Sequence, residues 1–300
     1  MLVILTHDIL PVFSMLALGM ILGRTGRVQR DEATTVNRVA FLVLQPALIF
    51  TLISAIDWQT FRADALGGYV LAQVVLFTLT YLLCRRLFGR EPLESWLLAM
   101  ATIFVNTLLY IWPISVLIYG EALALPVTAI AAWDSAVSFS FFIVTTDLMA
   151  NPGAGPGRAL RRIAGNPVLI AIALGLTVSL AGLTVPEPIL TACRFAGAGA
   201  APLTLLALGV ILSGQALTPT PLVATIAGLK LLAFPLLAAA ALWAIAPPEH
   251  WETLFILTAA GPSGAMAFAL ALLHRVRTDA IAPVIVWTSL LSLFSLAWLA

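Results

Sequence analysis

The chain alternates long apolar runs with short polar gaps, and this pattern predicts ten membrane-spanning helices. A helix needs roughly 20 mainly apolar residues to cross a bilayer. The runs of about that length have approximate limits 8–23, 36–56, 65–87, 94–118, 123–148, 166–184, 189–214, 220–246, 251–274 and 279–300. Hydrophobic residues make up 61% of the 300 positions and charged residues only 10%, far less charge than a soluble domain carries. The sequence therefore predicts an all-α polytopic membrane protein.

The arginines indicate how the bundle is oriented in the membrane. Most of them lie in four alternate gaps, which contain Arg24, Arg27, Arg30 and Arg38; Arg85, Arg86 and Arg90; Arg158, Arg161 and Arg162; and Arg275 and Arg277. The intervening gaps contain only Arg62 and Arg194. Because Lys and Arg are retained on the cytoplasmic side, both termini are predicted to lie on the non-cytoplasmic side of the inner (plasma) membrane.

An internal repeat divides the chain into two halves. Pro11 matches Pro167 and Pro46 matches Pro202, both at an offset of 156 residues, and Trp133-Asp134-Ser135 answers Trp287-Thr288-Ser289 at a slightly shorter offset. We therefore expect five spans in residues 1–150 and five in 166–300, joined by a Gly- and Pro-rich cytoplasmic loop at 151–165. Because five is odd, the second half enters the membrane from the opposite side, which gives a 5+5 inverted repeat.

The fourth span carries Pro113 and the ninth carries Pro262, and we expect each proline to mark a break in its helix. A proline inside a helix removes a backbone hydrogen bond and clashes with the carbonyl one turn back. In lipid the freed groups are costly unless they line a polar cavity or face other protein groups, and exposed half-helix N-termini favour an anion. Simple proline kinks are the alternative. The residues predicted to form a shared substrate site are Asn106, Thr107, Pro113, Pro262, Ser263 and Gly264.

Five longer stretches carry a family resemblance, and they are "FLVLQPALIF", "NTLLYIWPISVLIYGEAL", "NPVLIAIALGL", "APLTLLALGVIL" and "GPSGAMAFALALLHRVRTDAIAPVIVWTSLLSLFSL". They resemble the auxin efflux carrier family, and the resemblance covers nearly the whole chain. It implies a bile-acid symporter-like fold with a scaffold of helices 1, 2, 6 and 7 and a mobile transport domain of helices 3–5 and 8–10. It also implies small carboxylates as substrates, either auxin-like acids or malate-like dicarboxylates. Leu108, Ile111 and Met266 replace the Gly, Gly and Asn that the family pattern leads us to expect, so the substrate cannot be copied from the family.

Two ionisable residues lie deep inside predicted spans. Asp134 is near the middle of the fifth span, and Lys230, the only lysine, is about ten residues into the eighth. Charges at such depth usually serve transport. The two residues could form a pair that takes up and releases a proton, or Lys230 could attract an anionic substrate. The alternatives are that Lys230 snorkels to the headgroups and that Asp134 makes a structural hydrogen bond, as we expect of Gln45 and Gln73.

The sequence contains no parts that point to an enzyme. His7, His250 and His274 lack metal-ligand spacing, and neither a phosphate-binding loop nor a Gly-x-Ser-x-Gly nucleophile is present. The net charge of +1 argues against a nucleic-acid partner. We therefore expect a secondary carrier of small organic anions that works by an elevator type of alternating access. It would need no cofactor, could be coupled to H⁺ or Na⁺ or act as a uniporter, and could form a homodimer through its scaffold helices. The alternatives are a sodium or proton antiporter using Asp134 and a transport-inactive membrane sensor.

Overall fold

The computed structural model describes residues 2–151, 153 and 157–300, and their regular structure is helical, without strands. The α-helices are α1 (Leu2–Ile4), α2 (Leu10–Arg24), α3 (Arg30–Val39), α4 (Gln45–Ser54), α5 (Ala63–Arg86), α6 (Pro92–Ile103), α7 (Trp112–Tyr119), α8 (Leu125–Trp133), α9 (Phe139–Ala150), α10 (Gly157–Ala164), α11 (Pro167–Leu180), α12 (Glu187–Gly197), α13 (Ala200–Ser213), α14 (Pro221–Gly228), α15 (Phe234–Ile245), α16 (Glu249–Ala259), α17 (Met266–Leu273) and α18 (Ile281–Leu299). A 3₁₀ turn, η4, spans Glu121–Leu123.

Among the residues that the structure describes, seven helical segments are long and apolar enough to cross a membrane, as in a multi-pass membrane protein. They are Leu2–Arg24, Arg30–Ser54, Ala63–Arg86, Leu125–Ala150, Glu187–Ser213, Pro221–Ile245 and Ile281–Leu299. The other three predicted spans differ from this pattern. Residues 166–184 form the shorter α11, while 94–118 and 251–274 are each interrupted. The predicted loop at 151–165 contains a helix, α10, so that expectation was wrong for residues 157–164, and part of this stretch lies outside the described residues.

Wide π-helical turns connect several of the helices end to end. They are η1 (Leu5–Ile9), η2 (Ala40–Leu44), η3 (Thr107–Ile111), η5 (Asp134–Ser138) and η6 (Leu229–Ala233). Pro11, Pro46, Pro113 and Pro235 are each the second residue of the α-helix that follows such a turn. Proline lacks an N–H and crowds the carbonyl one turn back, and a widened turn accommodates both effects. These prolines therefore reshape the helices without ending them.

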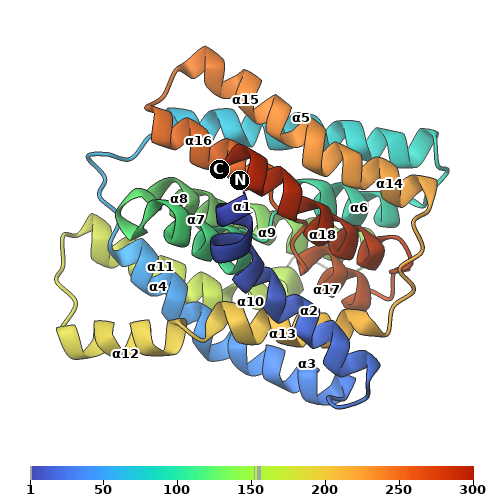
Figure 1. Ribbon diagram of the computed structural model, residues 1–300, viewed down its shortest axis with the longest axis horizontal. Helices are drawn as coiled ribbons and strands as arrows, with labels where there is room; N and C mark the ends of the chain where they lie inside the picture. Colours follow the sequence, from blue (N-terminus) through green and yellow to red (C-terminus); the bar gives the residue numbers. More distant parts are fainter. Residues whose placement is uncertain (1, 152, 154–156) are drawn as a thin grey trace.

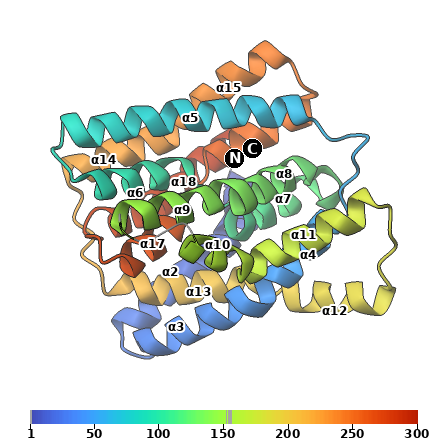
Figure 2. The ribbon, with the colours of Figure 1, turned by 180° about the vertical axis from the view of Figure 1, so that it is seen from behind.

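The helices are arranged in two outer groups with a central group between them. In Figures 1 and 2, α3, α12 and α13 lie along one side of the molecule and α5 and α15 along the other, with α6, α9 and α17 between. On the first side α2 packs along α13, and α4 packs along α11. On the second side α5 packs against α6 and α15. The two ends of the chain lie side by side in both views.

The contact between α2 and α13 depends on two glycines. Gly19 and Gly209 face each other, and a Cβ on either residue would come closer than 3.0 Å to the backbone carbonyl of Leu206 or Leu16, respectively. Small residues let helix backbones approach in a membrane, where close packing drives association. These two glycines therefore set the distance between α2 and α13.

Replacing Gly209 by valine should lower the stability of the purified protein, because its side chain has no room unless the two backbones separate. Overpacking of this kind costs about 1–3 kcal/mol, and the thermal unfolding midpoint in detergent measures the loss. Gly228→Ala is the matched control, since a Cβ there meets nothing within 4 Å. An unfolding midpoint for Gly209→Val equal to that of the control would contradict the prediction.

Candidate functional site

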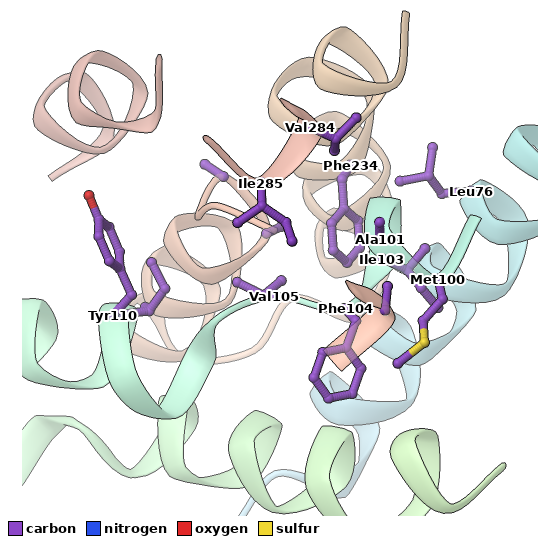
Figure 3. Close-up of a cluster of buried hydrophobic side chains, with 14 of the residues drawn as sticks. Leu76, Met100, Ala101, Ile103, Phe104, Val105, Tyr110, Phe234, Val284 and Ile285 are labelled. Atoms are coloured by element: carbon purple, nitrogen blue, oxygen red, sulfur yellow. The ribbon is translucent and has the colours of Figure 1, made fainter. Parts of the chain in front are cut away.

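Two interrupted helices meet in the centre of the molecule. The chain leaves helical structure between α6 and η3 and again between α16 and α17, and Val105 pairs with Ser263 in an antiparallel bridge. The Asn106 N–H donates to the Pro262 carbonyl at 3.0 Å, and the Gly264 N–H donates to the Phe104 carbonyl at 2.7 Å. Figure 3 shows the extended segment that carries Phe104 and Val105. Each break thus satisfies backbone groups freed by the other, as the membrane interior requires.

The first break does not lie at Pro113. The helix stops at Ile103 and resumes at Thr107, whereas Pro113 lies in α7 after the π turn η3. Asn106 occupies the N-cap position with a non-helical backbone, and its side chain caps no helix N–H. In the second interrupted helix the break does include Pro262, Ser263 and Gly264. Our expectation that Pro113 marks the break is therefore wrong, because this proline widens a turn instead.

A hydrogen-bond network around Asp134 borders the first break. The Gln73 amide donates to the Asp134 carboxylate at 2.8 Å and to the Ile103 carbonyl at 3.4 Å, and the Trp133 indole donates to the Gln73 oxygen at 3.0 Å. The Thr107 hydroxyl donates to the second Asp134 oxygen at 3.5 Å. Only 2% of Asp134 is exposed. Gln73, expected only to join helices, therefore orients Asp134.

Lys230 is fully buried beside the second break. Its exposure is 0%, and its ammonium donates to the carbonyl of Ala259, the last residue of α16, at 2.7 Å. The same Nζ lies 4.6 Å from the centre of the Phe234 ring, a favourable cation–π distance. Lys230 therefore does not snorkel to the membrane surface. Among the ion pairs of the described residues none joins Lys230 to Asp134, although their charges interact.

A cavity of about 380 Å³ lies against the crossing. Of the predicted site residues, Asn106, Thr107, Gly264 and Asp134 line it, whereas Pro113, Pro262, Ser263 and Lys230 do not. Thr107 begins the second half of the first interrupted helix, and Met266, which also lines the cavity, begins the second half of the other. The N-terminal ends of both half-helices therefore border one cavity, where the positive ends of their dipoles favour an anion.

The structure adds to the site a mainly polar stripe that the sequence analysis did not assign to it. Thr34, Asn37, Arg38, Phe41 and Gln45 all line the cavity, and Arg38 is exposed. Their spacing of three or four residues places them on one helical face. This spacing is visible in the sequence, but the predicted span begins only at residue 36, and the first turns of α3 fall in the polar gap before it. The stripe leads from the arginine-rich side of the protein to the crossing.

The bulky residues at the crossing reshape the cavity without closing it. Leu108 and Met266 line it and make its wall more apolar. Ile111 points elsewhere and packs on Gly261, where a Cβ would come closer than 3.0 Å to its side chain. The glycine in the second break therefore makes room for the isoleucine that follows the first.

A second cavity, of about 560 Å³, opens on the opposite side. It is lined by Asp57, Glu121 and Arg194 and, more deeply, by Leu52, Trp112 and Leu125. An apolar cluster includes Leu52 with Leu108 and Leu109 of the first cavity, and Trp112 and Leu125 pack on it. Apolar side chains therefore separate the cavities, so the crossing faces the arginine-rich side in this structure.

A protein-family model described as "Membrane transport protein" matches residues 4–151 and 157–299. The chain belongs to this membrane transport family. A relative from Methanothermobacter thermautotrophicus, described as an uncharacterized transporter, is 31% identical over 320 aligned residues, which cover 97% of this chain and 96% of the relative. Because the family match includes both interrupted helices, the crossing and its cavity lie within the transporter module itself. Family membership points to transport and not to an enzyme.

Proposed function

We propose that the protein is a secondary transporter that carries small organic anions by alternating access of an elevator type. The observation that carries this proposal is the cavity at the crossing. Two half-helix N-terminal ends, with Thr107 and Met266, border it together with the free amide of Asn106. Such ends attract a carboxylate, and discontinuous helices near the bilayer midplane are the usual substrate site in transporters of this kind.

The proposed architecture is the 5+5 inverted repeat in a bile-acid symporter-like fold. In support, the first halves of the interrupted helices end at Ile103 and Ala259, which are 156 residues apart, the same offset that relates Pro11 to Pro167. Asn106 and Pro262 share this offset and are hydrogen-bonded to each other. Inverted repeats of this kind have two states of similar energy in which the halves exchange roles.

In the elevator movement, the transport domain slides against the scaffold. The scaffold comprises α2, α3, α4, α11, α12 and α13, and the crossing belongs to the transport domain. Leu108 and Leu109, next to the first break, belong to the same buried apolar cluster as Leu48 and Leu52 of α4. Sliding would exchange these apolar contacts, close the first cavity and open the crossing toward the second one. A homodimer through the scaffold helices would hold the scaffold still during this movement.

The lining of the cavity favours an organic anion with an apolar body and one carboxylate. Phe41, Phe104 and Leu108 line it, but its only basic lining residue is the exposed Arg38 among the residues described. A second carboxylate, as in a malate-like dicarboxylate, would lie near the carboxylate of Asp134 and be repelled. An auxin-like acid therefore fits this cavity better.

Proton coupling through Asp134 would supply the driving force. This carboxylate lines the cavity, and within the described chain its charge interacts with the Lys230 ammonium of η6 and with the Tyr69 phenol of α5. If Asp134 takes up a proton when the anion binds, its own negative charge is neutralised. Moving the substrate-loaded domain through the membrane would then cost less free energy than moving it with Asp134 ionised.

Flux measurements in proteoliposomes test this function. Uptake of a panel of aromatic monocarboxylates and of dicarboxylates is measured under imposed pH and sodium gradients. We expect saturable uptake of monocarboxylates that responds to the pH gradient. Sodium or proton antiport without organic-acid flux would replace the proposal by a cation antiporter, and tight anion binding without any flux would indicate a sensor.

The proposed orientation places both termini outside the cytoplasm in the inner membrane. Its support is the arginine distribution and the position of the two ends side by side (Figure 1). A single cysteine added at either end of a background without Cys84 and Cys193 should react with an impermeant reagent in intact cells, and a cysteine at Gly26 should react only after permeabilisation. The reverse pattern would overturn the orientation.

A further inference from the structure

Gln73 and Lys230 hold corresponding places beside the two breaks. Gln73, in α5, donates to the carbonyl of Ile103, the last residue of α6, at 3.4 Å. Lys230, in η6, donates to the carbonyl of Ala259, the last residue of α16, at 2.7 Å. They are 157 residues apart, and the two carbonyls are 156 apart. The corresponding places beside the two breaks are thus occupied by a neutral amide in the first half of the chain and by an ammonium in the second.

The C-terminal end of a helix has a negative electrostatic potential. Its last carbonyls have no partner within the helix and carry the negative end of the dipole, and half-helix C-terminal ends of this kind coordinate cations in transporters with discontinuous helices. At the C-terminal end of α16 the Lys230 ammonium occupies this position, and the centre of the Phe234 ring lies 4.6 Å from its Nζ. Ser295 donates to the next carbonyl, that of Ala260, at 3.3 Å. The Ala259 carbonyl therefore holds the ammonium, while the neighbouring Ala260 carbonyl is bonded by Ser295.

The charges around the crossing balance without a bound ion. Asp134 lies near the N-terminal end of η3, next to Thr107, while Lys230 lies at the C-terminal end of α16. The negative charge thus lies at a positive helix N-terminus, and the positive charge lies at a negative helix C-terminus. Both residues are almost fully buried, with 2% and 0% exposure, so removing the ammonium would leave one buried carboxylate and one helix end without compensation.

We infer that Lys230 is a tethered cation that occupies, at the end of α16, the place where a free sodium ion would otherwise bind. This protein therefore takes no sodium at the crossing, and loss of the ammonium creates a sodium site there. The inference extends the proposed transport function by excluding sodium as the coupling ion at this site. Its test does not depend on transport.

The experiment compares the thermal unfolding midpoints of the purified wild type, Lys230→Met and Lys230→Gln in sodium chloride and choline chloride at equal ionic strength. Methionine keeps the length of the side chain without its charge, and glutamine copies the residue at position 73. The wild type should unfold at the same temperature in both salts. Both variants should unfold earlier in choline and recover on the order of 5 °C with saturating sodium. Arg27→Met, at an exposed arginine, controls for loss of a positive charge and should respond to neither salt.

Two results would overturn the inference. Saturable stabilisation of the wild type by sodium over choline would show that Lys230 does not occupy a sodium position, and this measurement needs no variant. A folded Lys230→Gln protein that is indifferent to sodium would show that the end of α16 is no cation site. If the wild type carried no organic acid while the variants gained sodium binding, the transport proposal would fail and this inference would stand.

Discussion

Replacing Asp134 by asparagine should abolish proton-driven accumulation of substrate. Asparagine has the same shape, and its oxygen can still accept the hydrogen bond from Gln73, which is 2.8 Å long in this structure, so the network around the first break is retained. It cannot take up a proton. One proton coupled to one anion over a gradient of two pH units supports up to about 100-fold accumulation, since each unit corresponds to about 1.4 kcal/mol. Asp134→Asn should lose this accumulation and keep exchange of substrate between the two sides.

The measurement is uptake into proteoliposomes with an acidic exterior, compared with counterflow at equal pH. Asp64→Asn is the matched control, because Asp64 is an exposed carboxylate paired with Arg62 at 2.6 Å outside the cavity. The control should accumulate substrate as the wild type does. Accumulation by Asp134→Asn at the wild-type level would assign the coupling proton to another group.

Replacing Asn106 by alanine should weaken substrate binding about 5- to 150-fold when binding is measured from either face. The Asn106 amide lines the cavity at the N-cap of the second half-helix and caps no backbone N–H itself. It is therefore available to the substrate. A lost hydrogen bond that leaves a buried partner unsatisfied costs about 1–3 kcal/mol, which corresponds to this range of affinity.

Binding from each face is measured in right-side-out and inside-out vesicles. Asn37→Ala supplies the contrast, because Asn37 belongs to the stripe that lines only the cavity on the arginine-rich side. It should reduce binding from that face alone. If Asn106→Ala behaved in the same one-sided way, the first break would act as a gate and not as the shared substrate site.

The interrupted helices illustrate how far sequence reasoning reaches. The polar residues Asn106 and Thr107 and the Pro262–Gly264 stretch were predicted to meet, and the structure brings them together. The exact break in the first helix could not be placed, because Phe104 and Val105 contain no local helix breaker. They leave the helix because Pro262 and Gly264 supply replacement hydrogen bonds. Pro113, the apparent breaker, is accommodated by a π turn instead.

The sequence by itself determined the membrane class, the approximate limits of the apolar segments and the depth of Asp134 and Lys230. These properties follow from local hydrophobicity and length, since a bilayer imposes the same requirement on every segment that crosses it. Only the tertiary structure decided where the first helix breaks, that Lys230 binds the end of α16, and that the stripe ending at Gln45 lines the cavity. Each of these depends on groups far apart in the chain, because a buried polar atom takes its partner from whatever element packs against it.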